Sequence, residues 1–168
     1  TSSTCPLSRK YAHVLARTAD EWTRRGFDFV MVSAVTSDPD SDIRSMAKEA
    51  GWKAPVLHDP TGKLARAIGL RSTTEAIVMD ASGTVLYRGA VDDQYGLGYA
   101  RSEAREQPLV RALASVEHGE RPVLAATTAP GCDLDSAGPI PVALAGEVTF
   151  HNRVSRILQA HCVECHHA

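Results

Sequence analysis

The sequence contains no run of about 18 or more apolar residues, so no segment reads as a helix that crosses a bilayer. It has no large excess of charge of either sign, since 18 basic and 20 acidic side chains leave a formal net charge of only −2. This balance gives no electrostatic reason to expect binding to nucleic acid or to an anionic membrane surface. No signal peptide is recognisable, and the abrupt opening TSSTCP leads us to expect a processed or trimmed N-terminus.

Cysteine is also scarce. The 4 cysteines are too few for a small scaffold held together by disulfides, and they differ in setting. Cys162 and Cys165 form a pair near the C-terminus, whereas Cys5 and Cys132 stand alone. With 43% hydrophobic and 23% charged residues, the 168-residue chain can bury a core in one ordinary domain with an extension, or in two very small domains.

The hydrophobic pattern predicts helices and strands in alternation. The expected order is a helix over 5–26, a strand over 27–35, a helix over 41–50, an extended piece over 54–62, a helix over 63–70, a hairpin of strands 76–79 and 85–88, and a helix over 108–117. This order implies an α/β domain in which helices cover a mixed sheet. We therefore divide the chain into a domain at 1–120, an extended Pro- and Gly-rich tail at 121–147, and a helical segment at 148–168.

Cys5 stands directly before the first expected helix, in TSSTCPLS. A thiol at a helix N-terminus meets unpaired backbone N–H groups and the positive end of the helix dipole, which lower its pKa and make the sulfur more nucleophilic. Pro6 suits the first helical turn because its missing N–H would have no partner there. The position fits either a reactive thiol or a buried structural cysteine, which packs as a small hydrophobe.

Residues 1–120 resemble the redoxin branch of the thioredoxin-like superfamily, which includes peroxiredoxins and extracytoplasmic thiol–disulfide proteins. The resemblance rests on CP at the start of the first helix, on FVMVSAVTSD, on APVLHDPTGKLARAIGLRSTTEAIVMDASGTVLYRGAVDDQYG and on the order of elements. It implies a thioredoxin-like mixed sheet flanked by helices, with Cys5 as the thiol nucleophile. The chain is similar to a branch with a single cysteine at the helix start and a later Gly-Cys, here Gly131-Cys132.

The sequence departs from the thioredoxin pattern in three ways. Ser8 stands where C-x-x-C would place a second cysteine, and Thr74 stands where a cis-proline is usual. Both departures disfavour a thioredoxin-style dithiol reductase. The family also begins with a β-strand before the active-site loop, whereas only residues 1–4 precede Cys5. We expect that strand either to lie upstream of this sequence or to be supplied by a partner.

The tail offers a substitute for the missing second cysteine. If it folds back over the domain, Cys132 can pair with Cys5 in an intramolecular disulfide, and a structural bond and a cycling bond would look the same in sequence. The alternative is that Cys132 is merely a packed or unpaired thiol.

A second open question concerns the polar, aromatic loop around Asp92, Asp93, Tyr95 and Tyr99. This loop either lines a binding surface or is a solvated connection between elements.

The C-terminal HCVECHHA contains C-x-x-C-H, the spacing at which a c-type haem is attached through two thioethers. A zinc knuckle normally needs about four ligands from two such pairs, and only one pair is present. The preceding VTFHNRVSRILQA resembles the opening helix of cytochrome c-like domains. That resemblance implies haem c bound through Cys162 and Cys165, with His166 as the proximal iron ligand. The alternative is a metal-binding tail without haem.

Together these features predict an extracytoplasmic, for instance periplasmic, redox protein that combines a thioredoxin-like thiol domain with a haem electron-transfer site. Cys5 and Cys132 are the expected thiol pair, and the expected partner is a redox protein or a larger electron-transfer assembly. Because the motif lies at the end of the sequence, we expect the chain to be a fragment of a longer polypeptide or part of an assembly. The rival hypothesis is a non-catalytic accessory or scaffold subunit, which the departures at Ser8 and Thr74 favour.

Overall fold

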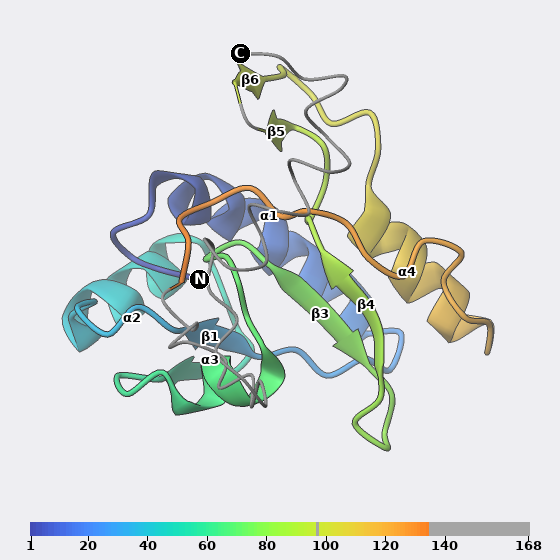
Figure 1. The fold of residues 1–168 in the computed structure, drawn as a ribbon, viewed down its shortest axis with the longest axis horizontal. Helices are drawn as coiled ribbons and strands as arrows, with labels where there is room; N and C mark the ends of the chain where they lie inside the picture. The colour runs from blue at the N-terminus through green and yellow to red at the C-terminus, as the bar shows by residue number, and fades with distance from the viewer. Residues whose placement is uncertain (97, 135–168) are drawn as a thin grey trace, which may run out of the picture. The chain divides into compact units, whose positions relative to one another are not determined.

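The computed structural model of the chain describes residues 1–96 and 98–134. Helices alternate with short strands along this part of the chain (Figure 1), which confirms the α/β class predicted from the sequence. The elements in chain order are α1 (Pro6–Thr23), β1 (Met31–Ser33), α2 (Asp40–Glu49), β2 (Val56–His58), α3 (Lys63–Ile68), β3 (Ala76–Met79), β4 (Val85–Gly89), β5 (Tyr95–Gly96), β6 (Tyr99–Ala100) and α4 (Pro108–Glu117).

The strands pair in both directions. β1 and β2 are parallel, whereas β3 and β4 are antiparallel, and within the described residues these pairs form separate two-stranded ladders. The strand expected over 27–35 is shorter than predicted, because its partner β2 offers only the three residues from Val56 to His58 for pairing. The predicted hairpin is confirmed, and Asp80 closes its turn by accepting the N–H groups of Ser82 and Thr84.

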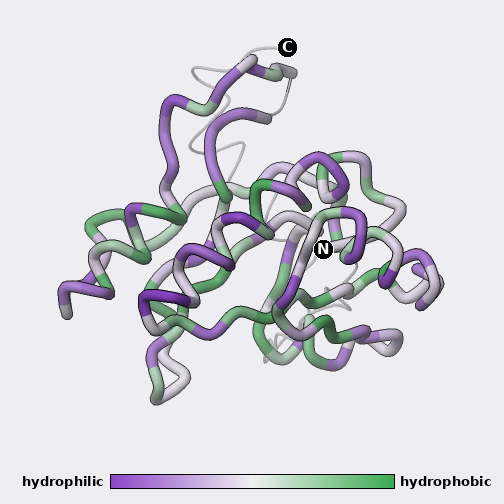
Figure 2. The backbone as a smooth tube through the Cα atoms, turned by 180° about the vertical axis from the view of Figure 1, so that it is seen from behind, coloured by the Kyte–Doolittle hydropathy of each residue, from purple (hydrophilic) through white to green (hydrophobic). Residues whose placement is uncertain are grey.

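The main core lies between α1, the β3–β4 hairpin and α4. Buried side chains recur every three or four residues along α1, so one face of the helix is removed from water. Figure 2 shows the same alternation of hydrophilic and hydrophobic positions along the helices. Burying the largest side chains of this cluster supplies much of the driving force for folding. The cluster consists of Tyr11, Trp22, Val78, Tyr87, Val91, Leu109, Ala112 and Leu113.

Beyond α4 the described part of the tail, residues 121–134, contains no helix and is held against the domain over residues 125–134, while the rest of the segment predicted to be extended, 135–147, lies outside the described residues. Its first contact runs beside β4, where the Arg88 N–H donates to the Ala125 carbonyl and the Thr127 N–H donates to the Arg88 carbonyl, both at 3.0 Å. The approach at Gly89 is close enough that a Cβ there would collide with Thr127. In Figure 1 the orange tail passes from α4 back toward the N-terminal end of α1.

The far end of the described tail is anchored by a second, smaller core. Leu134 packs with Ala34, Ala65 and Leu70, and its N–H donates to the Arg71 carbonyl at 2.9 Å. A backbone bridge also pairs Ser72 with Asp133. The tail is therefore fixed on both sides of Cys132, first beside β4 and then beside the loop that follows α3.

Two further expectations concern the ends of the chain and the membrane. The expected extra strand before Cys5 stays a prediction; in the described chain the amino group of Thr1 donates to the Val32 carbonyl of β1 at 2.6 Å. The loop after β4 forms the short β5–β6 pair, with Tyr95 opposite Ala100. Across residues 1–96 and 98–134 the structure has no helix with the length and hydropathy that a bilayer crossing requires.

Candidate functional site

Cys5 occupies the N-cap position of α1, as the sequence predicted for a thiol at the start of a helix. Its backbone is extended, with φ −80° and ψ 119°, and its carbonyl accepts the N–H of Arg9 at 3.1 Å. Only 2% of the residue is exposed. The thiol therefore lies beneath the surface, at the positive end of an 18-residue helix.

The structure places Cys132 directly over this thiol. The two sulfur atoms are 3.1 Å apart, and the Cys132 Sγ–H donates toward the Cys5 Sγ. Both cysteines carry free thiols, and Cys132 is exposed whereas Cys5 is buried. The tail has thus folded back over the domain, which is the arrangement that the disulfide hypothesis required.

Thr73 joins the two cysteines and was not singled out by sequence reasoning. Its hydroxyl donates to the Cys5 Sγ at 3.0 Å and accepts the N–H of Cys132 at 3.1 Å. Its own N–H donates to the Cys132 carbonyl at 3.0 Å. The residue is 1% exposed, so these bonds are sheltered from water. The run RSTTEA carries the only sequence signal, because three hydroxyl side chains stand together at Ser72, Thr73 and Thr74.

Gly131 allows the tail to approach this hydroxyl run. Its φ of 135° lies in the region that favours glycine, and a Cβ there would lie 2.5 Å from the Ser72 Oγ and 3.0 Å from the Thr73 Oγ1. The Pro130 carbonyl accepts hydrogen bonds from the hydroxyls of Ser72 and Thr74. Thr74, at the position where a proline is usual in the superfamily, therefore binds the tail that carries Cys132.

Ser8 stands where a second cysteine would complete C-x-x-C, and it has a different task. Its hydroxyl donates to the Thr73 carbonyl at 2.9 Å and accepts the Ser2 N–H at 3.2 Å. Ser8 is 2% exposed and lies in the first turn of α1. The side chain thus ties the helix start to the loop that holds Thr73.

The surroundings favour the thiolate form of Cys5. Burial by itself raises the pKa of this thiol, but the Thr73 hydroxyl, the Ser8 backbone N–H and the Cys132 thiol and backbone N–H outweigh that effect and lower the pKa to about 6. The hydrogen bond to Cys5 raises the pKa of Cys132, and burial adds to the rise. The two sulfurs are thereby differentiated, Cys5 as thiolate and Cys132 as thiol at neutral pH.

A buried carboxylate holds the residues that precede Cys5. Asp38, which is 2% exposed, accepts the Ser3 N–H at 2.9 Å and the hydroxyls of Thr4 at 2.8 Å, Ser33 at 3.0 Å and Ser2 at 3.2 Å. Burial opposes ionisation, but these hydrogen bonds together lower the pKa of Asp38 below its usual value. The Ser2 hydroxyl in turn accepts the Cys5 N–H at 3.2 Å. Asp38 therefore positions the loop that leads into the Cys5 thiol. Sequence reasoning did not identify this role of Asp38.

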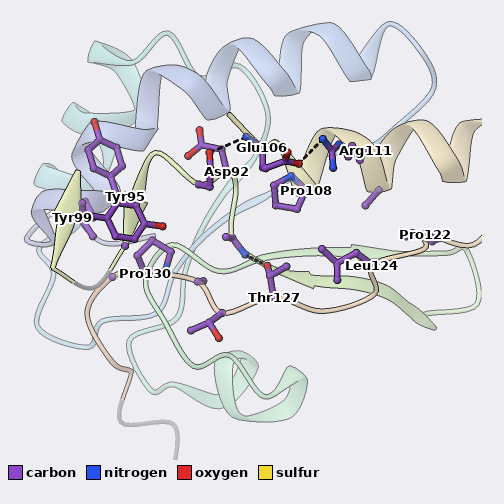
Figure 3. A pocket seen from close by; sticks show the side chains of 18 of the residues that line it. Asp92, Tyr95, Tyr99, Glu106, Pro108, Arg111, Pro122, Leu124, Thr127 and Pro130 are labelled. Carbon is purple, nitrogen blue, oxygen red and sulfur yellow. Dashed lines mark hydrogen bonds and ion pairs between the residues drawn. The ribbon is translucent and has the colours of Figure 1, made fainter. Parts of the chain in front are cut away.

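A groove of about 1200 Å³ is lined by Leu7 of α1 and Gly131 of the tail, each a near neighbour of one cysteine in sequence, whereas neither Cys5 nor Cys132 lines it. The loop that the sequence left as either a binding surface or a solvated connection forms part of its wall, through Asp92, Asp93, Tyr95 and Tyr99. Figure 3 shows Tyr95, Tyr99 and Pro130 near one end of the groove and Leu124 and Pro122 toward the other.

The predicted haem-attachment residues Cys162, Cys165 and His166 lie outside the described residues, as does the helix expected before them. Haem c, and His166 as its iron ligand, stay predictions. Within the part of the chain that the structure describes, no group of three or more His, Cys, Asp or Glu side chains is placed to hold a metal ion.

Comparison with known proteins assigns the family. The chain has a fold like that of two solved structures: a hypothetical protein from Sinorhizobium meliloti 1021 (TM-score 0.70, 22% identity, 82% of this chain and 76% of that one) and an uncharacterized conserved protein from Geobacillus kaustophilus (TM-score 0.66, 23% identity, 77% of this chain and 70% of that one). No curated protein matches. The profile of the Redoxin family matches residues 1–107, a span that begins before Cys5 and extends to the start of α4. The chain therefore belongs to the redoxin family.

Proposed function

We propose that this chain is a thiol redox protein in which Cys5 is the nucleophile and Cys132 is its disulfide partner. One observation carries the proposal: a buried thiol with a pKa lowered to about 6 lies 3.1 Å from a second free thiol on a separate segment. Thiolate is the reactive form of cysteine, and at pH 7 a pKa of about 6 leaves roughly nine-tenths of the group ionised.

The exposure of Cys5 favours a small electrophile. A hydroperoxide suits a residue that is 2% exposed better than a disulfide between two polypeptides does. In the proposed cycle the Cys5 thiolate attacks one peroxide oxygen, the O–O bond breaks, and an alcohol or water leaves after protonation. Cys5 becomes a sulfenic acid. The Cys132 sulfur then gives up its proton and attacks the Cys5 sulfur, water departs, and the Cys5–Cys132 disulfide forms.

In this cycle the second thiol comes from the tail, whereas in thioredoxins both thiols come from a C-x-x-C motif at the helix start. Ser8 cannot supply a second sulfur, and its hydroxyl is already bonded to Thr73. The second thiol comes instead from the tail, whose backbone is bonded to the same Thr73. Because the tail is anchored on both sides of Cys132, the two sulfurs are held together without closure of a long loop at the moment of reaction.

The test is a disulfide map of the fully reduced chain after treatment with hydrogen peroxide. We expect a linked peptide pair that contains Cys5 and Cys132. The variant Cys5→Ser should lose the link and consume peroxide at the rate of an ordinary thiol. The matched variant Cys132→Ser should keep the fast first step but stop at oxidised Cys5. Equal peroxide consumption by wild type and Cys5→Ser would refute the proposal and favour the scaffold hypothesis.

The sequence supports two further parts of the proposed function. We propose that the protein works outside the cytoplasm and that Cys162, Cys165 and His166 hold a haem c, because their spacing is that of covalent haem attachment. Haem would supply one-electron transfer to a redox partner. The intact mass of the chain from its native source, measured after denaturation, tests both parts: a retained haem-sized increment supports them, and a bare polypeptide mass refutes the haem.

A further inference from the structure

The loop that carries Thr73 is closed by a buried carboxylate. Residues 69–75 connect α3 to β3, and Glu75 is the last of them. The Glu75 side chain is 5% exposed, and its Oε2 accepts the Arg71 N–H at 2.8 Å. The Glu75 N–H donates to the Ser72 carbonyl at 3.2 Å. These two bonds fold the loop into a closed turn around Thr73.

Arg88 of β4 joins this carboxylate to the hairpin. Its Nε donates to the Glu75 Oε1 at 2.8 Å, and its Nη2 lies 2.8 Å from the same oxygen. The Nη2 also donates to the Gly69 carbonyl at the other end of the loop. One guanidinium therefore binds both ends of the loop to β4.

The backbone of the same arginine binds the tail. The Arg88 N–H and carbonyl are bonded to Ala125 and Thr127, as described above. The Arg71 carbonyl, next to the loop bond made by its own N–H, accepts the Leu134 N–H at 2.9 Å. The loop with Thr73 and the tail with Cys132 therefore share one anchor on β4.

The position of the Thr73 hydroxyl has little tolerance for movement. It lies 3.0 Å from the Cys5 Sγ and 3.1 Å from the Cys132 backbone nitrogen, and it is hydrogen-bonded to both. Hydrogen bonds weaken steeply as their distance and angle depart from the preferred geometry. A small shift of the loop relative to the tail would therefore weaken one bond or both.

We propose that Glu75 and Arg88 are a positioning pair, which aligns the Thr73 hydroxyl with the Cys5 sulfur and with the tail that carries Cys132. The pair acts through Thr73, whose hydroxyl is among the groups that lower the pKa of Cys5. This inference deepens the proposed function and rests on it for the step in which Cys132 attacks. The alignment of Thr73 with Cys5 is measurable without that step.

The direction of the pKa change separates positioning from a direct effect of charge. A carboxylate that acted on the thiolate by its charge would raise the pKa of Cys5, so removing Glu75 would lower this pKa. Loss of alignment has the opposite sign, because a weaker hydrogen bond from Thr73 stabilises the thiolate less.

The test is the pH dependence of iodoacetamide alkylation at Cys5 in the reduced full chain, resolved by peptide mapping. Glu75→Gln keeps the size of the side chain without its charge, whereas Glu75→Asp keeps the charge on a shorter side chain. Both should raise the pKa of Cys5 by roughly one unit, since each weakens a hydrogen bond to a thiolate. An unchanged or lower pKa in these variants would overturn the proposal.

The matched control is a second ion pair of the same kind outside the site. Arg25 donates through two nitrogens to the Glu117 carboxylate and so links the end of α1 to α4. Glu117→Gln breaks that pair in the same way and should leave the pKa of Cys5 at its wild-type value. A rise equal to that of Glu75→Gln would show a general loss of packing and would overturn the positioning role.

A double variant tests the route through Thr73. Thr73→Val alone and Thr73→Val combined with Glu75→Gln should titrate alike at Cys5, because no hydroxyl remains for the pair to align. A further rise in the double variant would overturn that route. If Glu75→Gln does not fold, its combination with Arg88→Met removes the unpaired charge and should show the same rise.

Failure of the proposed function is recognised separately. If peroxide forms no Cys5–Cys132 disulfide in the wild type, the proposed cycle has failed. The alkylation titrations are made on the reduced chain and still decide whether Glu75 and Arg88 position Thr73.

Discussion

Replacing Thr73 with valine should raise the pKa of Cys5. The substitution keeps the shape of the side chain and removes the hydroxyl that donates to the Cys5 Sγ at 3.0 Å. A hydrogen bond to a charged group contributes about 1.5–3 kcal/mol, and each 1.36 kcal/mol corresponds to about one pKa unit. The pKa should therefore rise by roughly one to two units, from about 6 to a value near 7 or 8.

The assay is the pH dependence of alkylation at Cys5 by iodoacetamide, followed by peptide mapping so that the other cysteines do not contribute. The thiolate absorbance in the ultraviolet gives an independent titration. The control is Thr73→Ser, which keeps a hydroxyl at the same position and should hold the pKa close to that of the wild type. A Thr73→Val chain that titrates like the wild type would refute the assigned role. A serine variant shifted as far as the valine variant would show that packing, and not the hydroxyl, matters.

Three other perturbations test the surroundings of the site. Gly131→Ala should displace the tail and slow formation of the Cys5–Cys132 disulfide in peroxide. The control is Gly119→Ala, because a Cβ at Gly119 would have no atom within 4 Å. Equal rates of disulfide formation in the two variants would contradict the close approach of the tail at Gly131. The pKa of Cys5 is about 6 in the folded chain and 9.0 in the unfolded chain, so its contribution to stability is complete above pH 9 and is lost as pH falls through 6. The free energy of unfolding of the reduced chain, measured by urea titration, should therefore rise between pH 6 and pH 9. Cys5→Ser should flatten that rise. Asp38→Ala should lower the free energy of unfolding by roughly 2–4 kcal/mol at neutral pH, because it leaves buried N–H and hydroxyl groups without their acceptor. A loss under about 0.5 kcal/mol would refute the role of Asp38 in holding the loop before Cys5.

The stability of the folded chain at low pH depends on the carboxylate of Asp38. Hydrogen bonds lower the pKa of Asp38 in the folded chain, so its contribution to stability is present above the unfolded pKa and is lost as pH falls through the folded value. The hydrogen bonds that hold the loop before Cys5 should therefore weaken as pH falls through the folded pKa of Asp38. The thiol site thus depends on two ionised groups of unlike kind, a thiolate at Cys5 and a carboxylate at Asp38.

Local sequence was enough to predict the helices of residues 1–134 and the position of Cys5 at the start of one of them. Apolar residues at helical spacing and Pro6 mark α1, so Cys5 was expected at its N-terminus, where the structure places it. The hairpin of β3 and β4 was recognisable from two β-rich runs around a DASG turn. Strand length was less predictable. The run 27–35 is mostly apolar, but only Met31–Ser33 pairs, because the length of a strand depends on how many residues its partner β2 can pair with.

The sequence by itself thus determined the α/β class, the helix-start thiol and the family resemblance, because these depend on residue type and on neighbours a few positions away. Tertiary structure alone decided that Cys132 meets Cys5, since the two are 127 residues apart and their meeting requires the tail to bind β4 and the loop after α3. It also decided that Thr73 hydrogen-bonds both cysteines and that Asp38 holds the loop before Cys5. Hydroxyl and carboxylate side chains are common on protein surfaces, and only burial beside a particular partner turns them into groups that control a pKa.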